Sequence, residues 1–209
     1  MCPPLPWELL IPVFRLLPHR IAFQIGVVLA IGYGFPDIRN NVILLEPNAS
    51  MDAASAKGQV DLLDWWMAYH RKMGSTPSYS YRALYLASKN GHVAVLDWWK
   101  CSGLPLKYTE DAMDSASRLG HISVLNWWRD SGLTLEYTQN AMDTASENGH
   151  IDVLRWWEAS GLDLRHSFWA IDSAKENGRE AVLQWWRDSG FTRNYEEQRN
   201  FQAMMDNDD

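Results

Sequence analysis

The stretch Gly120–Gly132, GHISVLNWWRDSG, decides the fold, because near-copies of it recur on both sides. Each copy carries two adjacent tryptophans, and these pairs stand at 65/66, 98/99, 127/128, 156/157 and 185/186. The steps between pairs are 33, 29, 29 and 29 residues, and four extra residues between Trp66 and Gly74 account for the long step. Self-similarity at a fixed period of this length indicates stacked structural repeats.

Each copy predicts two antiparallel helices. In the third copy Thr109 is the predicted N-cap of the first helix, with its hydroxyl accepting a free amide hydrogen. Apolar residues follow at helical spacing, and Gly120 then ends the helix because glycine tolerates a left-handed backbone. His121–Ser131 forms the predicted second helix, which Gly132 ends. In the first copy Pro47 occupies the hydroxyl position, so this cap is lost.

The tryptophan pairs are the predicted core of the array. Adjacent helical residues point about 100° apart, so the two rings face different neighbours. We expect one ring to pack on the first helix of its own unit and the other on the next unit. An aromatic cage or a nucleic-acid stacking platform is the alternative, but such platforms accompany basic grooves.

Composition narrows the function classes. The chain has 209 residues, of which 46% are hydrophobic and 22% charged, as in folded soluble proteins. Its net charge of −7 argues against nucleic-acid binding and against anionic membranes. The most apolar run, residues 21–35, is shorter than the roughly 20 residues of a membrane span, so a buried helix is favoured over a transmembrane one.

Cysteine usage and the N-terminus indicate the compartment. Cys2 and Cys101 belong to no spaced framework, so free thiols are expected rather than a disulfide or a metal site. The N-terminus lacks the basic region of a secretory signal. We therefore expect a cytoplasmic or nuclear protein in a reducing environment.

The units resemble ankyrin repeats. Asp111-Ala112-Met113-Asp114 stands where that family has Thr-Pro-Leu-His, and Ala116, Gly120 and His121 fall in register. The period here is 29 residues, whereas the family's is about 33. The missing residues fall between units, where the family forms a β-hairpin. The sequence pattern is closest to the short-period ankyrin-like repeats of fungi and water moulds. The resemblance implies an all-α solenoid of stacked antiparallel helix pairs, with shortened hairpins, over residues 48–191.

It also implies a non-catalytic protein–protein interaction module, whose binding residues are those that vary between repeats. The predicted partner-binding residues are Tyr81, Arg82, Glu110, Asp111, Gln139, Asn140, Phe168 and Trp169. They begin the first helices, and in an ankyrin-like stack this edge faces the concave groove. Phe168 and Trp169 are the expected hot spots, because large aromatics dominate interface energies. The alternative is ordinary solvated residues, with Trp169 packed under the C-terminal segment.

Other recurring residues are predicted to be structural. Tyr79, Tyr108, Tyr137 and His166 vary too little to encode specificity and are expected to pack. Asp52, Asp114, Asp143 and Asp172, and His92, His121 and His150, also recur once per unit. Neighbouring helices lie about 8–10 Å apart, so successive copies cannot share a metal ion. We expect the histidines to satisfy backbone groups, and the aspartates to occupy helix N-terminal regions that favour negative charge.

No phosphate loop, nucleophile elbow, HExxH or CxxC is present, so no catalytic residue, cofactor or metal site is predicted and an enzyme is disfavoured.

Both ends differ from the repeats. Residues 5–18, LPWELLIPVFRLLP, predict a helix after Pro6 that Pro12 either kinks or divides. This stretch is similar to the opening of an F-box, through Leu5, Pro6, Glu8, Leu9, Val13, Phe14, Leu17 and Pro18. It implies docking to a Skp-type adaptor, so a substrate-recruiting adaptor of a cullin ubiquitin ligase is the alternative function. Otherwise residues 1–47 form an N-terminal cap. Residues 192–209 predict a C-terminal capping helix and an acidic tail.

Overall fold

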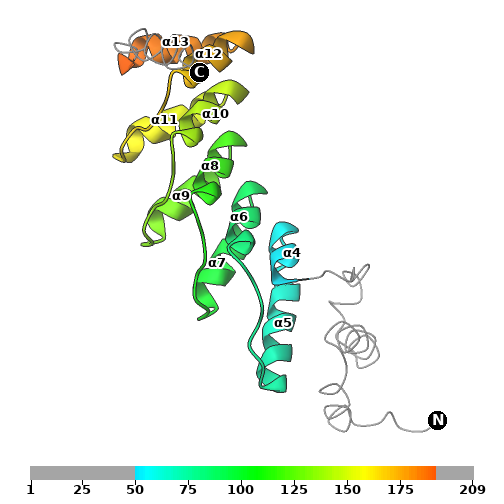
Figure 1. The fold of residues 1–209 in the computed structure, drawn as a ribbon. Coiled ribbons are helices and arrows are strands. Elements are labelled where there is room, and N and C mark those ends of the chain that lie inside the picture. The colour runs from blue at the N-terminus through cyan, green and yellow to red at the C-terminus, as the bar shows by residue number, and fades with distance from the viewer. Residues whose placement is uncertain (1–49, 192–209) are drawn as a thin grey trace, which may run out of the picture.

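Residues 50–191 are described by the structure, a computed structural model, and they contain ten helices and no strand (Figure 1). The helices form five consecutive pairs, called units 1 to 5 below. They are α4 (Met51–Ala56) with α5 (Val60–Met73), α6 (Arg82–Lys89) with α7 (Val93–Cys101), α8 (Asp111–Arg118) with α9 (Ile122–Asp130), α10 (Asn140–Asn148) with α11 (Ile151–Ser160), and α12 (Trp169–Glu176) with α13 (Glu180–Ser189). The predicted all-α class is confirmed over this range.

The predictions for the two ends of the chain lie outside the described residues. These are the helix, cap or F-box-like segment of residues 1–47, and the capping helix and acidic tail of residues 192–209. Within the described range, no helix has both the length and the apolarity needed to cross a membrane.

The units stack side by side in chain order, and the direction of the helix pairs turns gradually from α4/α5 to α12/α13 (Figure 1). Each first helix packs against the first helices before and after it, whereas the second helices contact one another more sparsely. The stack therefore has a tightly packed layer of first helices and a more open layer of second helices. The four extra residues of unit 1 lengthen α5, which has 14 residues.

Glycines end the helices as the sequence predicts, but for two different reasons. Gly120 and Gly132 both have a φ of +75°. At Gly120, the imidazole ring of His150 from the next unit also lies close, so that an added Cβ would stand 3.0 Å from its Nδ1. At Gly132 an added Cβ would meet nothing within 4 Å. Gly120 is thus required both for its conformation and for the approach of the next unit.

We expect Gly120→Ala to destabilise the protein more than Gly132→Ala. Both variants place a side chain at positive φ, which costs about 1–3 kcal/mol. Only Gly120→Ala must also displace His150, which adds about 1 kcal/mol or more. Denaturant unfolding of the two variants measures the difference, and equal losses would show that the contact with His150 contributes nothing.

Helix starts differ from the prediction. Glu110, not Thr109, is the N-cap of α8, and the Thr109 hydroxyl donates to the carboxylate of Asp111 (3.3 Å). The expected hydroxyl–amide bond does form at Thr138, whose Oγ1 accepts from the amide of Asn140 (3.1 Å). In unit 1 the cap lost at Pro47 is replaced by Ser50, whose Oγ accepts from the amide of Ala53 (3.2 Å).

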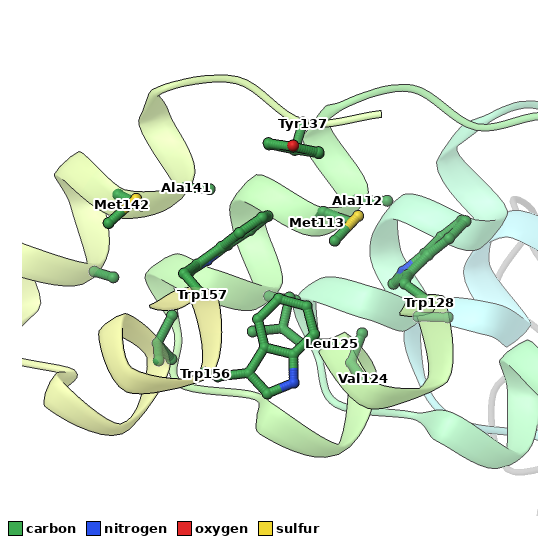
Figure 2. Close-up of a cluster of buried hydrophobic side chains, with 14 of the residues drawn as sticks. Ala112, Met113, Val124, Leu125, Trp128, Tyr137, Ala141, Met142, Trp156 and Trp157 are labelled. Carbon is green, nitrogen blue, oxygen red and sulfur yellow. The ribbon is translucent and has the colours of Figure 1, made fainter. Parts of the chain in front are cut away.

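The two tryptophans of a pair are buried differently. The second ring is at most 1% exposed in units 2 to 5, at Trp99, Trp128, Trp157 and Trp186. The first ring is only half-buried at Trp98 and Trp127. Trp128 and Trp157 occupy equivalent places along the stack in Figure 2. The second tryptophan is therefore the principal core residue of each unit.

Both tryptophans of a pair donate a hydrogen bond to the preceding unit, whereas the sequence predicted contacts with their own unit and the next. The indole Nε1 of Trp157 donates to the buried hydroxyl of Ser117 on α8 (3.1 Å). The same bond recurs at Trp99–Ser55, Trp128–Ser88 and Trp186–Ser146. The indole of Trp127 donates to Asp97 on α7 (2.7 Å). Both indoles of every unit from 2 to 5 are thus hydrogen-bonded to the preceding unit.

Candidate binding surface

The recurring aspartates join consecutive units. Oδ1 of Asp114 on α8 accepts from the amide of Thr138 (3.0 Å), and its Oδ2 accepts from the Thr138 hydroxyl (2.5 Å). The same pair of bonds, called the aspartate clasp below, joins Asp143 to Ser167 and Asp52 to Ser80. The predicted structural role is confirmed, because these three aspartates lie in the first turns of their own helices. They also hold the start of the next unit, which the sequence did not predict.

The junction between units 2 and 3 has no aspartate clasp. Tyr85 occupies the aspartate position of unit 2, so Thr109 faces no carboxylate from that unit. This absence explains why the Thr109 hydroxyl turns to Asp111 instead. The variation of one residue on α6 thus changes the hydrogen bond made by the hydroxyl before α8, although α8 begins at the same position in the repeat as the other first helices.

Burial raises the pKa of Asp114 and Asp143 in the aspartate clasp. For Asp114, desolvation is the largest cause, and the negative charges of Glu110 and Asp111 raise the pKa further. The two bonds from Thr138 lower it in part. The pKa of Asp143 is also raised, mainly by burial, against the bonds from Ser167. Ionisation of these groups therefore costs more in the folded than in the unfolded chain.

The raised pKa of Asp114 predicts the direction in which stability changes with pH. Because its folded pKa lies above its unfolded pKa of about 4, its contribution to stability is greatest at low pH and declines as pH rises through the folded pKa. We expect the stability of the wild type, relative to Asp114→Asn, to fall between about pH 4 and pH 7. Urea unfolding at both pH values measures this change. The same comparison with Asp163→Asn, at an exposed position, serves as the control, and a pH-independent difference at Asp114 would contradict the prediction.

The residues at the corner between the two helices of a unit also form hydrogen bonds to the preceding unit. His121 Nε2 donates to the carbonyl of Lys89 in the preceding unit (3.0 Å), which confirms the predicted backbone role at this position. In unit 5 Arg179 stands in the same place and donates from Nε to the carbonyl of Glu147 (3.0 Å). Over residues 50–191, no group of three or more histidine, cysteine or carboxylate side chains is placed to hold a metal ion.

The recurring rings before each first helix pack as predicted. The Tyr137 ring lies 4.7 Å from the Trp157 ring, centroid to centroid, and Figure 2 shows it over that indole. Equivalent contacts at 4.7–5.1 Å join Tyr79 to Trp99, Tyr108 to Trp128 and His166 to Trp186. These residues therefore complete the core.

The predicted partner-binding residues are exposed, with one exception. Trp169 is 55% exposed and Tyr81 is 44% exposed, although both are large and apolar. The exposed polar members are Arg82, Glu110, Asp111, Gln139 and Asn140. Phe168 is half-buried and packs on the core, with its ring 5.4 Å from that of Trp169, so less of this ring than of Trp169 is exposed to a partner. The eight residues lie at equivalent places in units 2 to 5 and thus follow one edge of the stack.

Residues outside the predicted set also lie beside this edge. A shallow depression of about 610 Å³ beside Gln139 and Asn140 is also lined by Leu164, Arg165 and His166. The Arg165 guanidinium lies 4.7 Å from the centroid of the Tyr137 ring and donates to the Tyr137 carbonyl (3.0 Å). Burial lowers the pKa of His166, and the negative charge of Asp143 opposes this effect. The sequence offered a signal here, because the Arg165 position varies as Lys107, Glu136 and Arg165 in units 2 to 4.

Leu119, just after α8, is a third exposed large apolar residue, at 40%. It lies at the opposite end of the first helix from the predicted residues. Leu119 continues the apolar spacing of the first helix, so its exposure does not follow from the sequence pattern.

Comparison with known proteins adds no relative. No protein-family model matches this chain, and no curated protein matches its sequence.

Proposed function

We propose that this chain is a non-catalytic protein-interaction module, built as a solenoid of ankyrin-like repeats with shortened hairpins. Five helix pairs in chain order support the architecture, as do the glycine stops and the ties between neighbouring units. The residues between α9 and α10, where the family would form a hairpin, contain no strand. The exposed thiol of Cys101 is consistent with a cytoplasmic or nuclear location.

One observation carries the proposal. The side chains that repeat in every unit bond or pack between units, whereas side chains that vary between units are exposed along one edge. The repeated tryptophans, aspartates and tyrosines bond or pack between units. The varying edge instead exposes Tyr81 and Trp169 to solvent. Solvated aromatic side chains are typical interface anchors, because tryptophan and tyrosine are enriched among binding hot spots.

A double substitution tests the proposal. We expect Tyr81→Ala/Trp169→Ala to leave stability nearly unchanged, because both side chains are exposed. Partners captured by the wild type in a quantitative pull-down are expected to fall by at least about tenfold, which is about 1.4 kcal/mol of binding energy. The matched control is Lys100→Ala/Arg129→Ala, at exposed positions near the ends of second helices. Equal capture by all three proteins would count against this edge as the binding surface.

A ubiquitin-ligase adaptor is the second candidate, favoured only by the order of F-box-like residues in positions 5–18. Its test is binding of a purified Skp-type adaptor to the full chain and to a Leu9→Ala/Val13→Ala/Phe14→Ala variant. Binding that depends on these three residues supports the candidate, and absence of binding removes it.

A further inference from the structure

Each first helix of units 2 to 5 carries three outward positions at spacing i, i+4 and i+7. Because a helix turns about 100° per residue, these positions lie on one side. The set, called the first-helix row below, comprises Arg82, Leu86, Lys89, Asp111, Ser115, Arg118, Asn140, Thr144, Glu147, Trp169, Ser173 and Glu176. In units 4 and 5 the middle hydroxyls of Thr144 and Ser173 donate to carbonyls of their own helices (2.6 and 2.5 Å), which leaves the outer residues to meet a partner.

The charge of the row reverses along the stack at its last position. Units 2 and 3 have Lys89 and Arg118 there, and a cation near a helix C-terminus is favoured by the helix dipole. Units 4 and 5 have Glu147 and Glu176, which the same dipole disfavours. Among residues 50–191 neither glutamate forms a salt bridge. Their negative charge therefore serves neither helix stability nor an internal pair.

An exposed indole completes the surface. Trp169 lies seven residues before Glu176 on the same side of α12, which is about 10 Å along the helix. It is 55% exposed. Asn140 and Glu147 occupy the corresponding places on α10, and both are exposed. Units 4 and 5 thus present two carboxylates, an amide and an apolar ring on one surface.

We propose that this surface binds an extended basic segment of a partner protein, with two lysines or arginines three residues apart and an apolar residue against Trp169. Neighbouring helices lie about 8–10 Å apart. A polyproline II chain has about three residues per turn and rises about 3.1 Å per residue, so its i and i+3 side chains share one side at a matching separation of about 9 Å. Two cations at that spacing face Glu147 and Glu176 together.

The chain's own C-terminal residues do not match this chemistry. Residues 192–209 contain two arginines and five acidic residues, which gives a net charge of −3. Charge complementarity therefore favours a segment from another protein. The inference rests on the proposed function, since it specifies the partner of the same edge.

Selection of random 12-residue peptides displayed on phage against the purified full chain tests the inference. We expect enriched peptides to carry a basic pair at i and i+3, and their affinity can be measured by fluorescence anisotropy. Glu147→Lys/Glu176→Lys is expected to weaken their binding by at least about tenfold, or about 1.4 kcal/mol. Trp169→Ala is expected to remove the preference for an apolar residue. The control is Asp61→Lys/Asp163→Lys, which makes the same charge change at exposed positions outside the row.

The remaining outcomes separate this inference from the proposed function. Peptides that depend on Trp169 or Tyr81 but lack the basic pair, or that bind the charge-reversed variant equally well, overturn the inference and leave the interaction module standing. Basic peptides weakened equally by the control variant show only general attraction and also overturn it. If no peptide is enriched on the wild-type chain, both are overturned. Thermal unfolding checks that each surface variant is folded.

Discussion

Trp157→Ala is expected to lower the free energy of unfolding by about 3–5 kcal/mol, the usual range for removing a large buried aromatic side chain. The ring is 1% exposed and lies 4.7 Å from the Tyr137 ring. Its removal leaves a cavity at the centre of unit 4 and frees the buried Ser117 hydroxyl in unit 3. Because Trp157 contacts two units, the loss should spread to both. Denaturant unfolding gives the total, and amide hydrogen exchange shows which helices open.

The matched control is Trp127→Ala, at the half-buried position of a pair. This ring keeps part of its surface in water and donates to the exposed Asp97. We expect a loss of about 1–2 kcal/mol, within the range of most single substitutions. If Trp127→Ala costs as much as Trp157→Ala, the distinction between the two rings is wrong. A loss below about 1 kcal/mol for Trp157→Ala would show that this ring is not part of the core.

The helix pairs could be predicted from the sequence, because their signals are local. Gly120 and Gly132 mark helix ends, and the apolar spacing between them marks a second helix. The unequal burial of Trp127 and Trp128 could not be predicted this way. Both residues sit in the same local pattern, and only the stacking of units decides which ring is enclosed.

The exposed edge was predictable for a similar reason, since residues that vary against a repeating background are free of the packing that fixes the others. Trp169 and Tyr81 follow this rule. Phe168 does not, because an aromatic residue next to the first turn can also reach the core. The repeat alignment showed that the aspartates are equivalent, but it could not identify their hydrogen-bond partners. Asp143, for example, bonds a residue 24 positions further along the chain.

Asp143→Ala is expected to lower the free energy of unfolding by about 2–3 kcal/mol and to loosen unit 5 from unit 4. Hydrogen bonds to a charged group contribute about 1.5–3 kcal/mol each. Asp143 accepts two of them, from the Ser167 amide (2.8 Å) and hydroxyl (2.5 Å). The net loss stays below their sum, because burial raises the pKa of this carboxyl and its removal relieves a desolvation cost. Global unfolding measures the loss, and faster amide exchange in α12 locates it.

The chain supplies its own control for this prediction. Ser167→Ala removes a hydroxyl that donates to Asp143, whereas Thr109→Ala removes one at the junction where Tyr85 replaces the aspartate. We expect Ser167→Ala to cost about 1–2 kcal/mol and Thr109→Ala less than about 0.5 kcal/mol. Both hydroxyls precede a first helix at the same position in the repeat, so the difference measures the clasp together with the bond from the Trp169 amide to the Ser167 hydroxyl (3.1 Å). If Thr109→Ala matches Ser167→Ala, these hydroxyls act only at their own helix starts and the aspartate clasp does not hold the units together.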